Sequence, residues 1–217
     1  MSTCKYQESF WDTFNAIAQQ CGELNVSLIQ KAVDYAIKYH GSQLRKSGEP
    51  YYSHPIAVGE MMMHHQFETD MIIAALLHDT VEDTELTFDD IEREFGANVQ
   101  KLVKSVTRLP DPITGKKPTP GEMMLQSLLH KDYDAILLKL LDRKHNMMTL
   151  QYMKPAKQIE IALETLNEMM PICRYSKGKF ADLEIALDAM QENALLFKDC
   201  IRPFDHFEFP QLDFQSI

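Results

Sequence analysis

The sequence has few of the residues that sheets, disulfide frameworks and structural zinc sites require. Only 8 of the 217 residues are glycine, and runs of β-branched residues are rare, so no segment shows a convincing strand pattern. Cysteine is also scarce, since Cys4, Cys21, Cys173 and Cys200 are widely scattered and form no CxxC pair. This spacing excludes a Cys-rich structural zinc site and favours reduced thiols over a disulfide framework.

The chain has no long apolar run. The longest, at residues 71–77, is far too short to cross a bilayer. The N-terminal sequence MSTCKYQESFWD has no basic stretch followed by an apolar segment, so it shows no secretory signal. We therefore expect a cytoplasmic protein with no membrane partner.

The chain also lacks an excess of positive charge. It carries 22 lysines and arginines against 32 aspartates and glutamates, which gives a formal net charge of -10. Nucleic-acid binding needs a basic footprint on the protein surface, so a nucleic-acid partner is not expected. A small anionic substrate remains compatible, because a metal ion and a few local cations can outweigh the global charge inside a cleft.

What the sequence does contain is helical patterning along nearly its whole length. Leu, Ala, Met and Glu are abundant, and apolar residues recur at helical spacing. We expect an all-α, single-domain helical bundle over residues 1–200, with a metal site between its helices, and a C-terminal tail over residues 201–217. The expected helices lie near residues 10–18, 26–40, from 54 onward, 71–78, 87–95, 98–108, 122–130, 133–150, 154–170 and 179–198.

Four polar residues on three separate segments form a candidate metal site. His54 follows a loop rich in Gly and Pro, His78 and Asp79 end the apolar run, and Asp142 lies much later in the chain. Imidazole and carboxylate groups together suit divalent Mn, Fe or Zn. Two imidazoles and two carboxylates leave coordination positions open for water and a phosphate oxygen, so this set predicts a metal-dependent phosphohydrolase. The other histidines are expected to be surface or packing residues.

Acidic residues continue beyond Asp79. His78 and Glu82 are four residues apart, as are Asp79 and Asp83, so all four side chains would share one mouth of the bundle if the helix continued. Such a concentration of carboxylates is costly without a nearby cation. We interpret Glu82 and Asp83 as the pair that orients and deprotonates the attacking water. A solvated helix terminus is the alternative interpretation.

Basic and amide side chains flank the candidate metal ligands. Arg45 and Lys46 lie together in the Gly- and Pro-rich loop, and Asn146 and either Thr149 or Leu150 would share a helical face with Asp142. Guanidinium and ammonium groups beside a metal suit a phosphorylated substrate, and an arginine can also stack on a purine. A solvated basic loop is the alternative interpretation of Arg45 and Lys46.

Three segments resemble the hydrolase domain of RelA/SpoT homologues, and especially the free-standing small alarmone hydrolases. They are HGSQLRKSGEPYYSHP, AALLHDTVEDTELTFDDIEREFGANVQKLVKSVTRL and LLKLLDRKHNMMTL. The resemblance extends from about residue 26 to residue 186. It implies a helical HD-type domain that binds Mn²⁺ and removes pyrophosphate from the 3′ position of (p)ppGpp, without the synthetase domain found in larger members of the family.

The resemblance also assigns roles residue by residue. The implied metal ligands are His54, His78, Asp79 and Asp142. The implied water-activating pair is Glu82 and Asp83. The implied nucleotide contacts are Arg45, Lys46, Ser47, Asn146 and Thr149.

Two positions depart from the family pattern, and the substrate stays open. The family's LADRLHNMRTL segment here has Lys144 in place of an apolar residue and Met148 in place of arginine. Animal relatives of this family are similar to NADPH 2′-phosphatases, so the same site could accept a 2′-phosphate monoester. A non-catalytic nucleotide sensor is a third hypothesis, and a homo-oligomer is left open.

Overall fold

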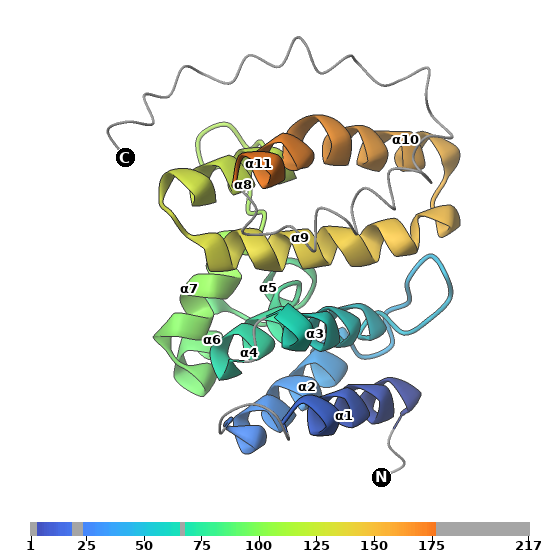
Figure 1. Ribbon diagram of the computed structural model, residues 1–217, viewed down its shortest axis with the longest axis vertical. Coiled ribbons are helices and arrows are strands. Elements are labelled where there is room, and N and C mark those ends of the chain that lie inside the picture. Colours follow the sequence, from blue (N-terminus) through green and yellow to red (C-terminus); the bar gives the residue numbers. More distant parts are fainter. Residues whose placement is uncertain (1–3, 19–23, 66–67, 177–217) are drawn as a thin grey trace.

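The computed structural model describes residues 4–18, 24–65 and 68–176, and within these ranges the regular structure is helical (Figure 1). The elements are α1 Lys5–Ala18, α2 Val26–His40, α3 Ser53–His65, α4 Thr69–Leu77, α5 Thr80–Asp83, α6 Phe88–Phe95, α7 Ala97–Val106, α8 Pro120–Leu129, α9 Tyr133–Met148, the 3₁₀ turn η1 Leu150–Tyr152, α10 Pro155–Glu164, the π-helical turn η2 Thr165–Met169 and α11 Met170–Tyr175. The prediction of an all-α fold is confirmed. The predicted helix at 179–198, the tail and the boundary at residue 200 lie outside the described residues.

Local sequence signals explain where several helices begin. Thr87 opens α6 and Thr119 opens α8, each with a capping box in which the threonine and the acidic residue three positions later exchange hydrogen bonds. The Asn25 side chain accepts from the Leu28 N–H at the start of α2, and the Asp132 side chain accepts from the Ala135 N–H at the start of α9. These caps fix the helix ends that border the loops.

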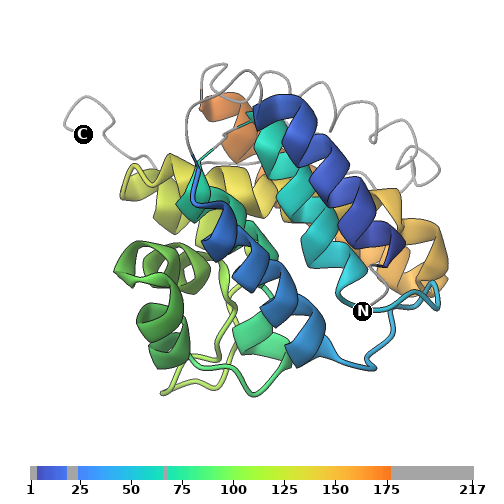
Figure 2. The same ribbon diagram turned by 90° about the horizontal axis from the view of Figure 1, so that it is seen from below.

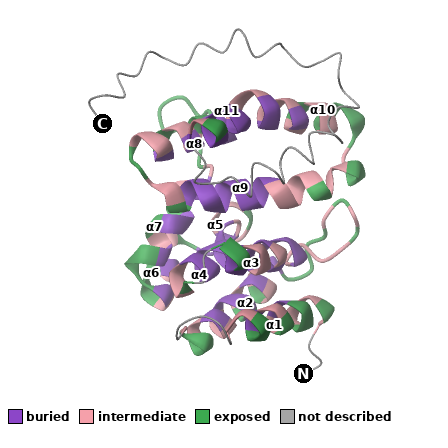
Figure 3. Cartoon of the chain, in the orientation of Figure 1, coloured by how far each residue is buried: buried purple, intermediate pink, exposed green. Residues whose placement is uncertain are grey.

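Helix α4 forms the centre of the bundle. Residues 71–77 are all buried, because α4 packs against α2, α3 and α7 at once (Figure 3). An all-round apolar helix is typical of such a central position. Turned by 90°, the molecule shows α1 lying alongside α3 (Figure 2).

Contact between α1, α3 and α4 is close at Gly59. A Cβ atom there would lie 3.0 Å from Leu76 Cδ2 and 3.2 Å from Phe10 Cε2. The absence of a side chain therefore lets α3, which begins one residue before His54, approach both neighbours.

Helix α9 lies between two layers of helices that both contribute to the main hydrophobic core. α8, α10, η2 and α11 lie on the side of α9 opposite α3 and α4 (Figure 1). Arg143 ties this layer to α9, since its guanidinium lies 3.1 Å from the Glu164 carboxylate and donates to the Ile161 carbonyl. No described helix has both the length and the apolar character that crossing a membrane would need.

Several predicted boundaries differ from those of the structure. The helix expected at 71–78 ends at Leu77, where Thr80 Oγ1 donates to the Leu77 carbonyl at 2.6 Å, and α5 starts separately. The helix expected to reach residue 150 ends at Met148 before η1, and the helix at 154–170 changes to π-helical geometry at Thr165. The turn at residues 78–79 between α4 and α5 is short, and the Asp83 N–H still donates to the Asp79 carbonyl at 3.0 Å.

Candidate active site

The candidate metal ligands meet where three segments converge. His54 lies in the first turn of α3, His78 and Asp79 follow α4, and Asp142 projects from α9. His54 Nε2 lies 3.2 Å from His78 Nε2 and 3.2 Å from Asp142 Oδ1. Candidate ligand atoms of His54, His78 and Asp142 all fall within 4.8 Å of one another, so one metal ion could bind them together.

Asp79 completes the cluster. Its Oδ1 lies 3.2 Å from His78 Nε2, and its Oδ2 lies 3.4 Å from His54 Nε2. A set of two imidazoles and two carboxylates suits a divalent transition metal. The sequence prediction that these four residues come together agrees with this geometry.

The outer nitrogen of each imidazole has its own partner, which leaves Nε2 for a metal. His78 Nδ1 lies 2.8 Å from the Ala75 carbonyl oxygen, to which it donates. His54 Nδ1 lies 2.7 Å from His145 Nδ1, an arrangement in which one neutral ring donates to the other. A metal-binding histidine needs its second nitrogen held in this way. The donor set therefore fits a metal ion.

His145 was missed by the sequence analysis, which counted it among surface or packing histidines. Burial, together with nearby His54 and Arg45, lowers the pKa of His145 to about 3. A neutral His145 can accept a hydrogen bond from the His54 Nδ1–H group when His54 Nε2 binds a metal. Its position three residues after Asp142, on the same helical face, was the available signal.

The charges in the cluster are balanced by a buried lysine. Lys139 Nζ lies 3.2 Å from Asp142 Oδ2 and donates to the Val106 carbonyl. Burial would raise the pKa of Asp142, but Lys139 and the two imidazoles hold it well below its usual range. Burial would likewise lower the pKa of His78, but Asp79 and Asp142 outweigh it and raise the value to about 9. Lys139 therefore stabilises the negative charge of Asp142 in the cluster.

The two carboxylates proposed to activate water point to different neighbours, because consecutive residues of a helix do not share a face and Glu82 and Asp83 both lie in α5. Glu82 Oε1 lies 2.7 Å from Lys117 Nζ, and Glu82 Oε2 accepts from the Arg108 N–H at 3.1 Å. Both contacts come from the loop between α7 and α8. The expectation that Glu82 and Asp83 act together on the attacking water stays a prediction.

Asp83 instead faces the loop between α2 and α3. The Tyr51 hydroxyl lies 2.6 Å from Asp83 Oδ2 and 3.2 Å from Asp79 Oδ2, so it reaches both a candidate ligand and a candidate base. Partial burial raises the pKa of Asp83, although the Tyr51 hydrogen bond opposes this shift. Burial and the carboxylates of Asp79 and Asp83 raise the pKa of Tyr51. The sequence analysis did not single out Tyr51.

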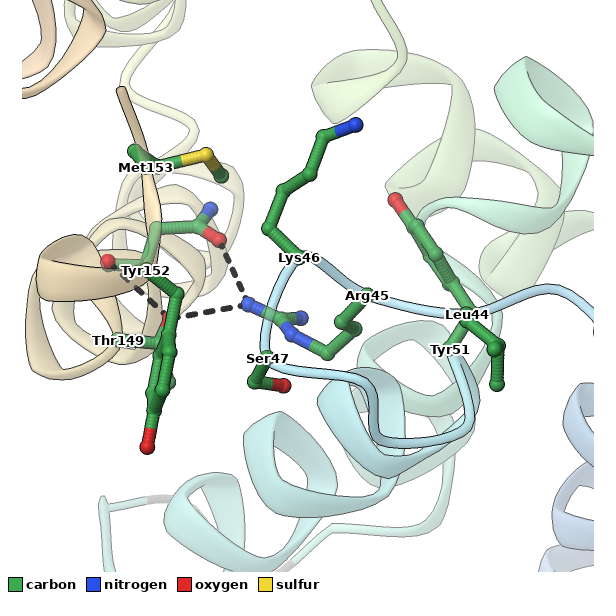
Figure 4. Close-up of a pocket in the computed structure, with 9 residues that line it drawn as sticks. Leu44, Arg45, Lys46, Ser47, Tyr51, Thr149, Tyr152 and Met153 are labelled. Carbon is green, nitrogen blue, oxygen red and sulfur yellow. Dashed lines mark hydrogen bonds between the residues drawn. The ribbon is translucent and has the colours of Figure 1, made fainter.

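A pocket with a basic wall opens beside the cluster (Figure 4). Arg45 Nη2 donates to Thr149 Oγ1 at 3.0 Å and makes a longer contact of 3.5 Å with Asn146 Oδ1. The loop therefore meets the end of α9, as the sequence predicted. The residues that line the pocket are Leu44, Arg45, Lys46, Ser47, Tyr51, Asn146, Thr149, Tyr152 and Met153.

Two residues are shared between pocket and cluster. Asn146 lines the pocket and donates from Nδ2 to Asp142 Oδ1 at 2.6 Å. Tyr51 also lines the pocket and reaches Asp79. A ligand in the pocket would thus lie against residues that contact the candidate metal ligands. Met148, which departs from the family pattern, is exposed near the end of α9.

The comparison with protein families now identifies the chain. The HD domain family model matches residues 32–168, which is more than half of the sequence. The chain belongs to the HD domain family. The match includes every candidate metal ligand, and the chain is homologous to RelA/SpoT family proteins.

Relatives of this HD domain have named activities of their own. A GTP pyrophosphokinase of Brucella ovis is 40% identical over 153 residues, which make up 69% of this chain and 20% of the relative. A GTP pyrophosphokinase of Myxococcus xanthus is 36% identical over 162 residues, or 72% of this chain and 21% of the relative. The chain thus spans about a fifth of the length of the curated relatives it matches.

A solved structure shares the fold. It is described as a metazoan orthologue of SpoT that hydrolyses ppGpp and plays a role in starvation responses. The two chains are 25% identical, the match covers 81% of this chain and 100% of that chain, and the TM-score is 0.66. The prediction of an HD-type bundle resembling a RelA/SpoT hydrolase domain is confirmed.

Proposed function

We propose that this protein is a hydrolase that removes the 3′-pyrophosphate group from ppGpp and pppGpp, giving GDP or GTP and pyrophosphate. The observation that carries the proposal is the shared wall between a His/Asp cluster and a basic pocket. Asn146 contacts both Asp142 and Arg45, so a phosphate held by the pocket would lie next to the cluster. The described activity of the solved metazoan relative supports hydrolysis as the reaction.

A divalent metal, for which we propose Mn²⁺, would be held by His54, His78, Asp79 and Asp142. When bound, such an ion polarises a phosphate oxygen and lowers the pKa of water. The mixture of nitrogen and carboxylate donors suits Mn²⁺.

The remaining roles belong to side chains around the cluster. Asp83 orients the attacking water and accepts its proton, and Glu82 assists from the side of the α7–α8 loop. Arg45 and Lys46 hold the nucleotide base and its phosphates, together with Ser47. Asn146 and Thr149 fix the ribose and orient Arg45. This arrangement requires no covalent intermediate.

The name of the curated relatives describes pyrophosphate transfer to GTP, and it belongs to proteins about five times longer than the matched segment. The matched segment in this chain carries the HD cluster. We therefore assign it hydrolysis. We also propose a cytoplasmic location, a nucleotide as the main partner, and one hydrolase domain over residues 1–200.

The deciding experiment measures product release from metal-loaded protein that is offered ppGpp and NADPH separately. Pyrophosphate from ppGpp, lost on chelation and restored by Mn²⁺, is the expected result. Release of phosphate from NADPH alone would contradict the proposed substrate and keep the assignment as a metal-dependent phosphatase. Tight ppGpp binding without any product, at confirmed metal content, would identify a nucleotide sensor.

The role of Asp83 has its own test. Asp83→Asn should lower kcat by about 10²–10⁴, the usual contribution of a general base, while leaving metal content unchanged. Asp89→Asn, an exposed carboxylate in the first turn of α6, is the matched control and should keep wild-type turnover. Near-normal turnover by Asp83→Asn with metal bound would remove the general-base assignment.

A further inference from the structure

Tyr51 occupies the boundary between the nucleotide pocket and the metal cluster. Its ring lines the pocket, and its hydroxyl reaches Asp83 Oδ2 at 2.6 Å and Asp79 Oδ2 at 3.2 Å. A phenol has one proton, so it donates fully to one acceptor at a time, and the shorter contact selects Asp83. With its Oδ2 engaged, Asp83 has Oδ1 left for a water molecule.

The Tyr51 ring is held in place from several sides. It stacks on His40 with a centroid distance of 4.7 Å and an interplanar angle of 27°, and it meets His54 edge-on at 6.5 Å. The Tyr51 backbone N–H donates to the Gln43 carbonyl at 2.8 Å. The hydroxyl therefore has a fixed origin from which it directs its hydrogen bond.

The same loop also holds the backbone of Asp83. Gln43 Nε2 donates to the Asp83 carbonyl at 2.9 Å, and Gln43 Oε1 lies 3.1 Å from His40 Nδ1. Asp83 ends the short helix α5 and is accessible to solvent, so few other contacts restrain its side chain. The α2–α3 loop thus fixes the main chain of Asp83 through Gln43 and its carboxylate through Tyr51.

We propose that Tyr51 is a positioning residue that aims the Asp83 carboxylate at the water beside Asp79. This inference rests on the proposed function, because it takes Asp83 as the group that receives the proton. Tyr51 itself transfers no proton and touches no reacting atom. Its contribution is to restrict Asp83 to one orientation relative to a metal ligand, which is how a supporting hydrogen bond acts on a catalytic group.

The first test uses Tyr51→Phe, which keeps the ring on His40 and removes only the hydroxyl. We expect kcat for ppGpp to fall about 10- to 100-fold, in line with the loss of a supporting hydrogen bond, while KM and bound metal stay within about twofold. Tyr52→Phe is the matched control and should keep wild-type kinetics, because Tyr52 packs against the core and edge-on to Tyr6.

Two kinetic results would overturn the proposal. A rise in KM alone would make Tyr51 only a wall of the pocket. Loss of metal, with activity restored by excess Mn²⁺, would mean that the hydroxyl serves Asp79 instead. Adding Tyr51→Phe to Asp83→Asn should cost little beyond Asp83→Asn alone, and multiplied effects would contradict a route through Asp83.

A structural readout separates this proposal from the choice of substrate. Crystal structures of wild type and Tyr51→Phe, each with Mn²⁺, should show the Asp83 carboxylate turned away from Asp79 in the variant only. An unmoved Asp83 would overturn the proposal even if the protein proved to act on NADPH or on no nucleotide. A displaced Asp83 in a protein without ppGpp turnover would retain the positioning role and discard the proposed substrate.

Discussion

The His/Asp cluster and the pocket beside it both contact Asn146 and Tyr51, yet they are built differently. His54 and His78 are each 2% exposed, and helices α3, α4 and α9 carry or flank the ligands. The pocket is formed by a loop and the end of α9, and its rim includes Leu44 at 65% and Tyr152 at 52% exposure. Under the function proposed above, the buried half carries out the chemistry, and substrate preference can change in the exposed half.

Removing a candidate metal ligand should produce the largest effect, because it disrupts the buried metal site itself. His78→Ala deletes the nitrogen that faces both Asp79 and Asp142. We expect loss of bound metal. Turnover should fall by more than the roughly 10- to 100-fold that is typical when a residue supporting a metal ligand is removed. Metal analysis and a turnover assay check this. His64→Ala, an exposed histidine at the end of α3, should leave both quantities unchanged.

The next variant sharpens the comparison because it changes a residue that contacts a candidate metal ligand and leaves the ligands themselves in place. His145→Ala removes the partner of His54 Nδ1. We expect metal affinity to fall about 10- to 100-fold, measured as the dissociation constant for Mn²⁺. His145→Gln supplies an acceptor oxygen and should recover most of the affinity. Equal losses in both variants would show that hydrogen bonding to His54 is not the cause.

In the exposed half, Arg45→Ala should change binding without touching the metal. Losing a charged hydrogen-bonding group costs about 1.5–3 kcal/mol, so KM for ppGpp should rise about 10- to 100-fold at unchanged metal content. Arg93→Ala removes an exposed arginine on α6 and serves as the control. If Arg45→Ala also released the metal, the two halves would not be separable.

The smallest effect is expected where the α7–α8 loop meets Glu82. The Lys117–Glu82 pair is partly exposed, and such pairs contribute roughly 0–1 kcal/mol. Lys117→Ala should therefore change kcat/KM by no more than about fivefold. Lys116→Ala, whose ammonium lies 3.8 Å from Glu122, is the neighbouring control. A much larger loss for Lys117→Ala would give the loop a direct part in turnover.

The sequence predicted the buried half better than its surroundings. Helical periodicity and the absence of strand patterns were enough for the fold, and the mixed His/Asp set was enough to bring His54, His78, Asp79 and Asp142 together. Each of these residues is adjacent to a strong local signal, such as the end of an apolar run. Chemistry that depends on residue type can therefore be predicted from the sequence alone.

Contacts between distant segments were not visible in the same way. Glu82 and Asp83 are adjacent in α5, and the partners that each one meets belong to loops that lie far away in the sequence. Lys139 lies three residues before Asp142 on α9, so helical spacing allows that contact, whereas its hydrogen bond to the Val106 carbonyl depends on the fold. Tyr51 is one of several tyrosines, and its distance to Asp83 follows from the loop geometry.

Gly59 is a position at which a single substitution is expected to destabilise the bundle. A methyl group there would press on Leu76 and Phe10, which lie in the core on the side of α3 away from solvent. Overpacking of this kind costs about 1–3 kcal/mol. His54 lies on the same helix. Gly59→Ala is therefore a candidate for a temperature-sensitive allele, whose product keeps its activity at low temperature and loses it at high temperature.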